Sequence, residues 1–461
     1  MGNAVAKYQK YAEYKDSGVE WLGEIPSHWD LKASKLLFNI VNGSTPKSGV
    51  EEFWEGDITW VTPSDLSKIT NFEISESSRT ITQKGLNSCG TSLVPSGSLI
   101  LSCRAPIGSL AITTKDVCTN QGCKSLVVKA RVNTKFMYYF FSVSTEQLNI
   151  LGRGTTFLEL SSDELGNFKL PYPKINDQSA IANFLDHETT KIDSLIEKQQ
   201  KLIELLKEKR QAVISHAVTK GLNPDVPMKD SGVEWLGQVP EHWELVPLKH
   251  LCTFSGGGTP TKDNLSYWTD GTIPWVSPKD MKTFWLNETQ DYITEKAVKE
   301  SSTNMVEPHS LLMVVRSGIL QRTIPIAINT VPVTMNQDMK ALKFSKRVIV
   351  EYIADLIHGN TAQLLLEWSK DGATVESIEH EYLANSVMPV PPLDEQEAIV
   401  EMIARKMQVY KDLTSKAEAQ IILLQERRTA LISSAVTGKI DVRNWQNPNH
   451  NNNEAQMELS Q

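Results

Sequence analysis

The amino-acid sequence predicts an α/β (α+β) fold with two similar globular domains related by a pseudo-twofold axis. It also predicts two long helices that join the domains and form an antiparallel coiled coil. Three observations lead to this prediction: a sequence repeat within the 461 residues, short apolar runs typical of buried strands, and two stretches with sevenfold apolar periodicity.

The repeat has two parts in each half of the chain. Residues 15–29 (KDSGVEWLGEIPSHW) match 229–243 (KDSGVEWLGQVPEHW), and 208–221 (EKRQAVISHAVTKG) match 426–439 (ERRTALISSAVTGK). The copies lie 214 and 218 residues apart, so we expect a tandem duplication with almost cyclic order. Two similar surfaces that have diverged separately suit a partner with twofold symmetry, and duplex DNA is such a partner.

Each half begins with a long stretch of mixed pattern. The apolar runs at 92–103 (SLVPSGSLILSC) and 309–318 (HSLLMVVRSG) indicate buried strands, which Gly, Pro, Ser and Asn interrupt often. Helix-like segments lie at 136–143 and 350–356. This pattern predicts a globule with a strongly bent sheet in each half.

Each globule ends in a proline-marked turn that leads into a helix. The two turns are PYPKINDQ at 171–178 and PVPPLDEQ at 389–396. Asn176 and Asp394 occupy matching places and are predicted as the helix N-caps.

Apolar residues then recur every seven positions, which is typical of a coiled coil. Each stretch runs for about 41 residues without Gly or Pro, enough for a rod of ~60 Å, whereas an ordinary amphipathic helix on its own globule is the alternative. Polar seam residues such as Gln199 and Gln420 cost stability but fix register, which is a hypothesis. The predicted seam comprises Leu185, Ile192, Leu195, Gln199, Leu202, Leu206 and Val213 in the first helix, and Ile403, Tyr410, Leu413, Gln420, Leu424 and Leu431 in the second.

The charge balance argues against a protein that binds DNA by itself. The net charge is −8, and the two helical stretches, 178–220 and 396–439, are the more basic part of the chain. Neutralisation of phosphates by Lys and Arg supplies most non-specific affinity for DNA. If this protein recognises DNA, another subunit therefore supplies much of the affinity.

The remaining composition indicates a cytoplasmic protein without a membrane partner. No apolar run approaches the ~20 residues of a membrane span, and the N-terminus lacks the apolar stretch of a secretory signal. Residues 441–461 are polar and predicted to be a disordered tail. The five cysteines lack a CxxC pair, so we expect reduced thiols and no metal, with zinc as the weaker alternative: Cys89, Cys103, Cys118, Cys123 and Cys252.

Comparison of the two halves separates scaffold from candidate DNA contacts. Four tryptophans in each half match, which indicates shared core packing more than base stacking. Thr-Pro-Lys turns suit phosphate contacts, Arg suits guanine and Asn or Gln suits adenine, although the Asn-Gln pairs serve equally well to stabilise turns. The matched candidates are Thr45, Lys47, Arg104, Asn120, Gln121 and Lys124 in the first half, and Thr259, Lys262, Arg316, Asn336, Gln337 and Lys340 in the second.

Three segment pairs differ most between the halves: 66–92 and 282–308, 105–118 and 317–335, and 132–153 and 347–371. Divergence within a common scaffold is expected of two domains that recognise different half-sites. The candidate sequence-reading residues in these segments are Arg79, Lys84, Arg153, Gln321, Arg322 and Lys370.

No catalytic motif is found. The Asp/Asn/Ser-Pro-Pro-Tyr/Phe signature of amino-methyltransferases is missing, because Val390-Pro391-Pro392-Leu393 fails at both ends. The turn SGGGTPTK at 255–262 lacks the spacing of a phosphate-binding loop, and the sequence contains neither an H-E-x-x-H pair nor a nucleophile elbow. We expect a recognition protein rather than an enzyme.

Several motifs of the two halves form one set. They are the duplicated GVEWLG openings, the STPK and GTPTK turns, the paired CTNQGCK and TMNQDMK segments, the PPLDEQEAI helix start, and the ISHAVTKG and ISSAVTGK endings. With this set, the chain resembles the specificity subunit of type I restriction–modification systems over about residues 15–440. The first helix start, PYPKINDQSAI, departs from the second, which puts the equivalence of the two partner-docking sites in doubt.

The resemblance implies five segments: target-recognition domains at 1–175 and 223–392, conserved helical regions at 176–222 and 393–440, and the tail. It implies that each domain recognises one half of a split DNA target and that the helices set the unread gap. The implied partners are double-stranded DNA, two modification subunits and restriction subunits. The chain itself is then expected to hold no cofactor, with S-adenosylmethionine, ATP and magnesium on the partner subunits.

Three other interpretations remain open from the sequence. A free-standing DNA-binding adaptor or regulator without a methylase partner predicts tight DNA binding by the isolated chain. A nuclease or methyltransferase with a disguised site predicts turnover by the purified chain. A purely structural coiled-coil scaffold predicts indifference to DNA.

Overall fold

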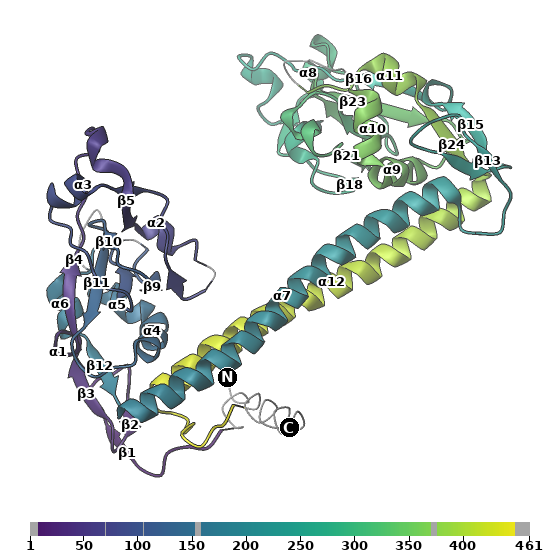
Figure 1. Ribbon diagram of the computed structural model, residues 1–461. Coiled ribbons are helices and arrows are strands. Elements are labelled where there is room, and N and C mark those ends of the chain that lie inside the picture. The colour runs from purple at the N-terminus through teal and green to yellow at the C-terminus, as the bar shows by residue number, and fades with distance from the viewer. Residues whose placement is uncertain (1–7, 70, 105, 153–157, 370–375, 448–461) are drawn as a thin grey trace. The chain divides into compact units, whose positions relative to one another are not determined.

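The computed structural model describes residues 8–69, 71–104, 106–152, 158–369 and 376–447. The chain forms two compact units: unit 1 comprises residues 1–199 and 419–461, and unit 2 comprises residues 200–418. Each unit therefore contains one half of each long helix, α7 (Ile175–Lys220) and α12 (Leu393–Val436) (Figure 1). The predicted α/β fold and its duplication are confirmed.

Unit 1 is built on a five-stranded sheet in the order β4-β11-β8-β9-β6 and a three-stranded sheet in the order β10-β5-β7. Two short antiparallel pairs, β1-β2 and β12-β3, complete its strands. The strands are β1 Tyr14–Asp16, β2 Glu24–Pro26, β3 Asp30–Ala33, β4 Phe38–Asn42, β5 Trp54–Val61, β6 Glu73–Ile74, β7 Thr80–Ile81, β8 Leu99–Ser102, β9 Leu110–Thr113, β10 Cys118–Thr119, β11 Cys123–Val128 and β12 Lys169–Tyr172. The helices are α1 Ser34–Leu37, η1 Glu51–Phe53, α2 Pro63–Leu66, α3 Gln83–Asn87, α4 Thr134–Ser142, α5 Thr145–Leu151 and α6 Ser162–Asn167.

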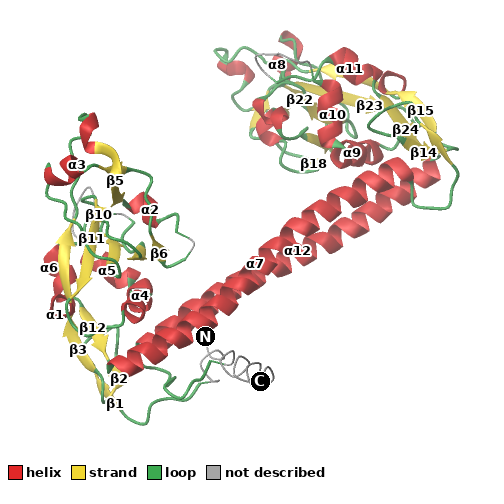
Figure 2. Ribbon diagram, in the orientation of Figure 1, coloured by secondary structure: helices red, strands yellow, loops and turns green. Residues whose placement is uncertain are grey.

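Unit 2 repeats both sheets strand for strand, as β16-β23-β20-β21-β18 and β19-β17-β22, with β13-β14 and β15-β24 as its short pairs (Figure 2). Its strands are β13 Met228–Asp230, β14 Gln238–Pro240, β15 Glu244–Pro247, β16 Cys252–Gly256, β17 Ile273–Val276, β18 Trp285–Leu286, β19 Asp291–Ile293, β20 Leu311–Val314, β21 Ile326–Asn329, β22 Thr334–Met335, β23 Met339–Phe344 and β24 Val387–Val390. Its helices are η2 Leu248–His250, η3 Leu265–Tyr267, η4 Pro278–Asp280, α8 Glu295–Glu300, η5 Gly318–Gln321, α9 Val350–Gly359, α10 Thr361–Trp368 and α11 His380–Asn385.

The two long helices begin one residue earlier than the caps predicted for them. Asn176 and Asp394 therefore lie in the first turn and are not N-caps. Instead, Gln178 and Gln396 are fully buried, and their Nε2 atoms donate to Pro173 O at 2.8 Å and to Pro391 O at 2.9 Å. Their Oε1 atoms accept from the backbone N–H groups that start α4 and α9, so one amide side chain ties each long helix to its own globule.

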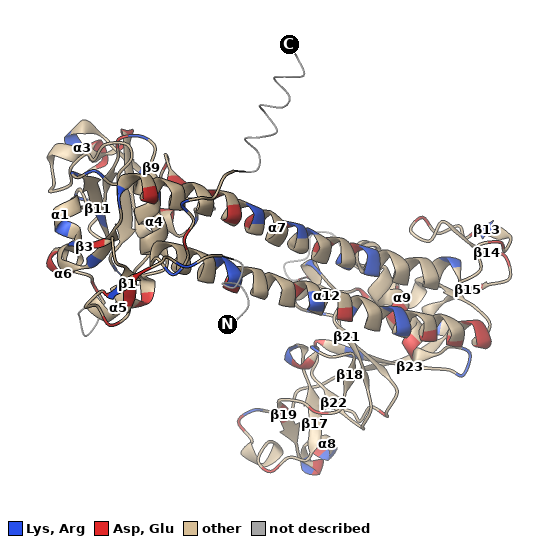
Figure 3. Cartoon of the chain, turned by 90° about the horizontal axis from the view of Figure 1, so that it is seen from below, with Lys and Arg blue, Asp and Glu red and all other residues tan. Residues whose placement is uncertain are grey.

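Within each unit the two helices run antiparallel and pack through apolar side chains. In unit 1, Ile192 and Leu431 belong to one core, and the Arg428 guanidinium donates to Asp193 at 2.8 Å. In unit 2, Ile214 shares a core with Ile403. Lys, Arg, Asp and Glu are interspersed along the exposed faces of both helices (Figure 3).

The predicted seam has two rows of residues. The buried stripe follows the first row, which contains Leu185 and Ile192, and departs from the second row, which contains Leu195 and Leu202. Leu185, Ile192, Ile403 and Leu431 are buried, and Gln199, Leu206, Val213, Tyr410 and Leu424 are half-buried. Leu195, Leu202 and Leu413 are 46%, 43% and 42% exposed, and Gln420 is exposed too, so their assignment to the seam is wrong. The second row runs instead through Ile196, Ile203, Thr414 and Ile421, four residues after each member of the first row.

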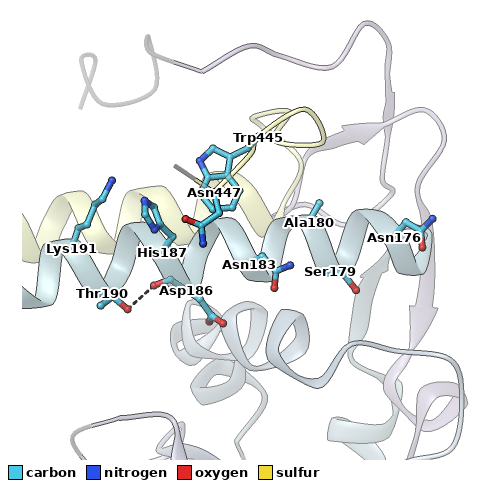
Figure 4. A pocket seen from close by; sticks show the side chains of 10 residues that line it. All are labelled: Asn176, Ser179, Ala180, Asn183, Asp186, His187, Thr190, Lys191, Trp445 and Asn447. Atoms are coloured by element: carbon cyan, nitrogen blue, oxygen red, sulfur yellow. Dashed lines mark hydrogen bonds between the residues drawn. The ribbon is translucent and has the colours of Figure 1, made fainter. Parts of the chain in front are cut away.

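The start of the predicted disordered tail packs on unit 1. Val442 is buried, and Asp441 N–H donates to Gln9 O at 2.7 Å. The Trp445 ring lies 5.2 Å from the His187 ring on α7 (Figure 4). It lies 5.6 Å from the ring of Phe184. The prediction of disorder is therefore wrong for residues 441–447, because two apolar side chains anchor them, and the rest of the tail lies outside the described residues.

Among the described residues, no helix combines the length and the apolar character that crossing a membrane requires.

Candidate nucleic-acid interface

In each unit, one polar loop connects a strand of the large sheet to a strand of the small sheet. The loop follows β4 in unit 1 and contains Thr45 and Lys47; in unit 2 it follows β16 and contains Thr259 and Lys262. All four side chains are exposed or half-exposed. These loops are the Thr-Pro-Lys turns that the sequence indicated.

Two tryptophan side chains donate hydrogen bonds to the backbone of each loop. In unit 1, the indole N–H of Trp60 donates to Ser44 O at 3.0 Å, and that of Trp54 donates to Lys47 O at 3.3 Å. The two rings pack edge to face with centroids 5.1 Å apart. The predicted core role of these tryptophans is thus incomplete, because their polar ends also fix the loop backbone.

Unit 2 repeats this arrangement bond for bond. The indole N–H of Trp275 donates to Gly258 O at 3.0 Å, and that of Trp268 donates to Thr261 O at 3.3 Å. Their rings also pack edge to face, with centroids 5.1 Å apart.

The Asn-Gln turns lie against these loops. Asn120 N–H donates to Val61 O at 3.0 Å, and the Asn120 Oδ1 atom accepts from Gly122 N at 3.0 Å. In unit 2, Asn336 N–H donates to Val276 O at 2.9 Å, and Asn336 Oδ1 accepts from the N–H of Asp338 at 3.1 Å. Both asparagines therefore stabilise turns, the alternative that the sequence had left open for them.

The neighbouring glutamines project to the surface and meet the loop. The Thr45 hydroxyl donates to Gln121 Oε1, and the Thr259 hydroxyl donates to Gln337 Oε1. The close approach requires glycine at position 43, where a Cβ atom would lie 1.9 Å from Asn120 O. The structure thus brings four of the predicted contact residues together as two matched Thr–Gln pairs.

The lysines that follow these turns are not presented in the same way. Lys124 is only 6% exposed, and its Nζ atom donates to Asn42 Oδ1 at 2.8 Å. The predicted DNA contact of Lys124 conflicts with this burial, because the side chain binds Asn42, which lies directly opposite it on the neighbouring strand β4. Lys340 is half-buried at the matching place on β23.

Arg104 and Arg316 are both exposed where their strands end, but their surroundings differ. Arg104 Nε donates to Glu159 Oε2 at 3.0 Å, so its charge is already balanced. Arg316 has no ion-pair partner among the described residues. Arg153 and Lys370 lie outside the described residues.

Of the divergent candidates in unit 1, Arg79 is the most firmly held. Its guanidinium lies 3.6 Å from the ring centroid of Trp54. The preceding residue, Ser78, donates its N–H to Asp65 Oδ1 at 2.8 Å. Burial by itself raises the pKa of Asp65, but hydrogen bonds from Ser78 and Thr62 outweigh this effect and lower it.

The other divergent candidates are exposed on the surface of their units. Lys84 forms an exposed ion pair with Glu52 at 2.9 Å, whose hydrogen bond raises the pKa of the lysine. Gln321 is an exposed residue at the end of η5. Arg322 lines a groove of 1390 Å³ between α7, α9 and the β17–β18 connection. None of the residues that line this groove belongs to the Thr259 loop.

A comparison with protein families finds two copies of one domain in the chain. Residues 26–206 and 240–422 each match the family described as "Type I restriction modification DNA specificity domain". The chain belongs to this family.

Curated specificity subunits are similar to this chain over nearly its whole length or over part of it. The MjaIX specificity subunit of Methanocaldococcus jannaschii is 27% identical over 95% of this chain and 99% of that protein. The EcoR124I/EcoR124II specificity subunit of Escherichia coli is 36% identical over 43% of this chain and 47% of that protein.

Two solved structures share the fold. A chain from a study of type I R-M complex assembly and conformational transition has a TM-score of 0.69, 15% identity and coverage of 89% of this chain and 98% of that chain. The HsdS subunit of Thermoanaerobacter tengcongensis has a TM-score of 0.55, 15% identity and coverage of 90% and 98%.

Specificity subunits recognise DNA and are not catalytic, which agrees with the expectation of a recognition protein. Among the described residues, no group of His, Cys, Asp or Glu has the geometry of a metal site. The cysteines of this specificity subunit are free, and burial raises the pKa of the Cys103, Cys118 and Cys252 thiols to about 12. Such thiols stay protonated and unreactive at neutral pH.

Sequence reasoning missed how Asp65 and Asp280 hold the segments that contain Ser78 and Gln290. Each accepts the backbone N–H and the hydroxyl of a residue three positions earlier, Thr62 or Ser277, and then a backbone N–H of a more distant loop. The signal is present as T-x-x-D and S-x-x-D, the pattern of a capping box, and a search for that pattern would have found both.

Proposed function

We propose that this specificity subunit recognises a split DNA target, with one half-site for each globule and the long helices between them. The recognition domains are then residues 1–175 and 223–392, and the helical regions are 176–222 and 393–440. The observation that supports this most directly is the matched Thr–Gln loop in each unit beside unmatched polar residues.

The helices support a role in spacing. α7 has 46 residues and α12 has 44. At 1.5 Å per residue a straight helix of this length spans about 69 Å, which corresponds to about 20 base pairs at 3.4 Å each. We expect both half-sites to lie within that span.

Exposed leucines on the helices support two equivalent docking sites for a partner. Leu195 and Leu423 in unit 1 are 46% and 57% exposed, and Leu413 and Leu205 in unit 2 are 42% and 49% exposed. Leu195 matches Leu413 and Leu423 matches Leu205, each 218 residues apart. Two identical subunits are the partners that two equivalent apolar patches fit best, which favours two modification subunits.

The modification subunits bring S-adenosylmethionine to the complex in this proposal, and the restriction subunits bring ATP and magnesium. The net charge of −8 fits such an assembly, because the partners then supply further cationic contacts to DNA.

The test is methylation sequencing of the host genome with the wild-type gene, without it, and with a chimaera whose residues 1–175 come from another specificity subunit. Loss of one split methylated motif on deletion is expected, with one altered half-site in the chimaera. Alteration of both half-sites would refute the assignment of one half-site to each globule.

Partner docking is tested with Leu195→Asp/Leu413→Asp, which places a charge in both proposed patches. Loss of co-purifying modification subunits is expected. Lys198→Asp/Lys416→Asp, at equivalent exposed positions on the same helices, is the matched control and should retain the partner.

A further inference from the structure

The Thr–Gln loops have the same structure in both units, although the residues around them differ. We propose that each loop binds a DNA phosphate and takes no part in sequence choice. The residues involved are Thr45, Lys47 and Gln121 in unit 1, and Thr259, Lys262 and Gln337 in unit 2, where Thr261 takes the place of Lys47 and Lys262 follows one position later. This inference rests on the proposed recognition of DNA and assigns the loops a chemical role within it.

The loop backbone is fixed before any partner binds. Two indole N–H groups hold its carbonyls in each unit, and Ser44 N–H donates to Thr119 O at 3.0 Å, matched by Gly258 N–H to Met335 O at 2.8 Å. An exposed loop with this many internal bonds loses little conformational entropy when it binds a ligand. Rigidity of this kind suits a contact that sets position.

The exposed chemistry of the loop consists of hydrogen-bond donors. Because the threonine hydroxyl occupies Oε1 of Gln121, the two N–H groups of the amide remain for a ligand. Lys47 and Lys262 are exposed, and neither forms an ion pair with a described carboxylate. The ammonium and the amide NH₂ groups are donors, whereas the oxygens of a phosphate are acceptors only.

The duplication argues that this contact carries no sequence information. The two half-sites of a split target present different base edges but the same phosphate backbone. A feature kept in both units therefore suits the backbone, whereas a base-reading residue should differ. Asp65 accepts the N–H of Ser78, and Asp280 accepts the N–H of Gln290 at the matching place. The next residue is Arg79 in unit 1 but Asp291 in unit 2. Such a difference between the units suits base recognition.

The test uses the complex of the full chain with its modification subunits. Its affinity is measured against salt concentration for a duplex with the methylated motif and for a scrambled duplex. Lys47→Ala and Lys262→Ala are each expected to reduce the slope of log K against log salt by about 0.9, and the double variant by about twice as much. Affinity for both duplexes should fall by one common factor, with the methylated motif unchanged.

Two further variants examine the amide. Gln121→Glu retains the acceptor for Thr45 but replaces the donors by a negative charge, so it should weaken both duplexes by more than Gln121→Ala does. Lys169→Ala removes the same charge from an exposed site on β12 and should leave the salt slope unchanged. Unaltered thermal unfolding of all these variants excludes a folding defect.

Three results would overturn the proposal. An unchanged slope in the double variant excludes a phosphate contact, and a broadened half-site in the methylome identifies the loop as a base reader. Loss of modification subunits at an unchanged slope makes the loop a protein-docking surface instead. Failure of the wild-type complex to prefer its motif over the scrambled duplex refutes the proposed function, and the phosphate contact with it.

Discussion

The two units differ where the globule meets the helix pair. In unit 1, α4 contacts α7 through paired charges: Lys135 Nζ lies 2.6 Å from an Asp186 oxygen, and the Tyr139 hydroxyl donates to the other oxygen at 2.8 Å. The Arg428–Asp193 ion pair then joins the two helices. Every charge named in this junction has a partner.

The matching positions in unit 2 lack these pairs. Glu351, Asp355 and Ala404 replace the lysine, the tyrosine and the first aspartate, and Lys411 replaces the second aspartate. Arg210 keeps its charge but contacts the Met407 sulfur at 3.1 Å. The 1390 Å³ groove opens at this junction.

The comparison shows which features a duplicated fold retains. The sheets, the buried glutamines at the helix starts and the tryptophan-held loops are the same in both units, because apolar packing and backbone hydrogen bonds fix them. Charged residues at the half-exposed junction have changed, because each pair there contributes little to the fold by itself.

The largest expected effect is at the paired junction of unit 1. Asp186→Ala leaves Lys135 and the buried Tyr139 hydroxyl without their shared acceptor, so the free energy of unfolding should fall by about 2–3 kcal/mol. Urea unfolding followed by fluorescence measures this change. Glu197→Ala, at an exposed site on the same helix, should cost less than about 0.5 kcal/mol, and equal losses for the two variants would contradict the comparison.

The junction of unit 2 should be sensitive to pH. Burial, then repulsion by Glu351, raises the pKa of Asp355 from 3.8 to about 7, against an opposing effect of Arg210. The folded state thus retains a proton that the unfolded state releases, and the contribution of Asp355 to stability falls as pH rises from 3.8 to about 7. His358 on the same helix contributes with the opposite sign, because burial and then Arg210 lower its pKa from 6.5 to about 4.

Asp355→Asn cannot ionise and should be more stable than the wild type above pH 7, by about 2 kcal/mol after allowance for partial exposure. Near pH 4 the two proteins should differ little. Urea unfolding between pH 4 and 8 checks this dependence, with Asp263→Asn as an exposed control. A constant difference across the range would show that Asp355 does not titrate as described.

A reciprocal exchange tests the helix starts. Glu395 accepts from the Trp243 indole at 3.0 Å and lies 2.8 Å from His242, whereas the shorter Asp177 lies 3.5 Å from His28. The Trp29 indole N–H is buried without a hydrogen-bond partner among the described residues.

Asp177→Glu should raise the free energy of unfolding by about 1 kcal/mol, and Glu395→Asp should lower it by a similar amount. Thermal unfolding and hydrogen exchange of the two indole N–H groups measure the effect. Changes of the same sign in both variants would contradict the proposed role of the longer glutamate side chain at the helix start.

The smallest effect concerns the seam. Gln199→Leu replaces a half-buried amide and should stabilise the protein by about 0.5–1 kcal/mol, whereas exposed Gln420→Leu should change stability by less than about 0.5 kcal/mol. Thermal unfolding of the two single variants compares them. Equal stabilisation would return Gln420 to the seam.

Features repeated in the sequence were predictable, and contacts between distant residues were not. The duplication indicated both globules and both helices, and the matched Thr-Pro-Lys and Asn-Gln segments that it singled out lie against each other in both units. The second seam row was wrong because Leu195 and Ile196 are both apolar, so spacings of three and four fit equally well. Only the packing of the two helices in the folded protein shows which of these two residues faces the partner helix.

The same limit applies to the candidate site. Arg104 pairs with Glu159 and Arg79 stacks on Trp54, and neither partner is close in sequence. The anchoring role of Gln178 was hidden because a glutamine among polar residues resembles an ordinary surface position. Burial and partners of this kind depend on tertiary packing, which periodicity does not encode.

The composition of unit 1 has a consequence for the order of events during translation. Unit 2 is one continuous segment, whereas unit 1 needs residues 419–447, where the Lys439 ammonium donates to Glu24 O at 2.6 Å and Trp445 covers α7. The ribosome must therefore add about 200 further residues after the first globule, on the order of ten to forty seconds of synthesis, before that unit is complete. The globule that emerges first is the last to be finished, and until then it exposes an apolar face to chaperones.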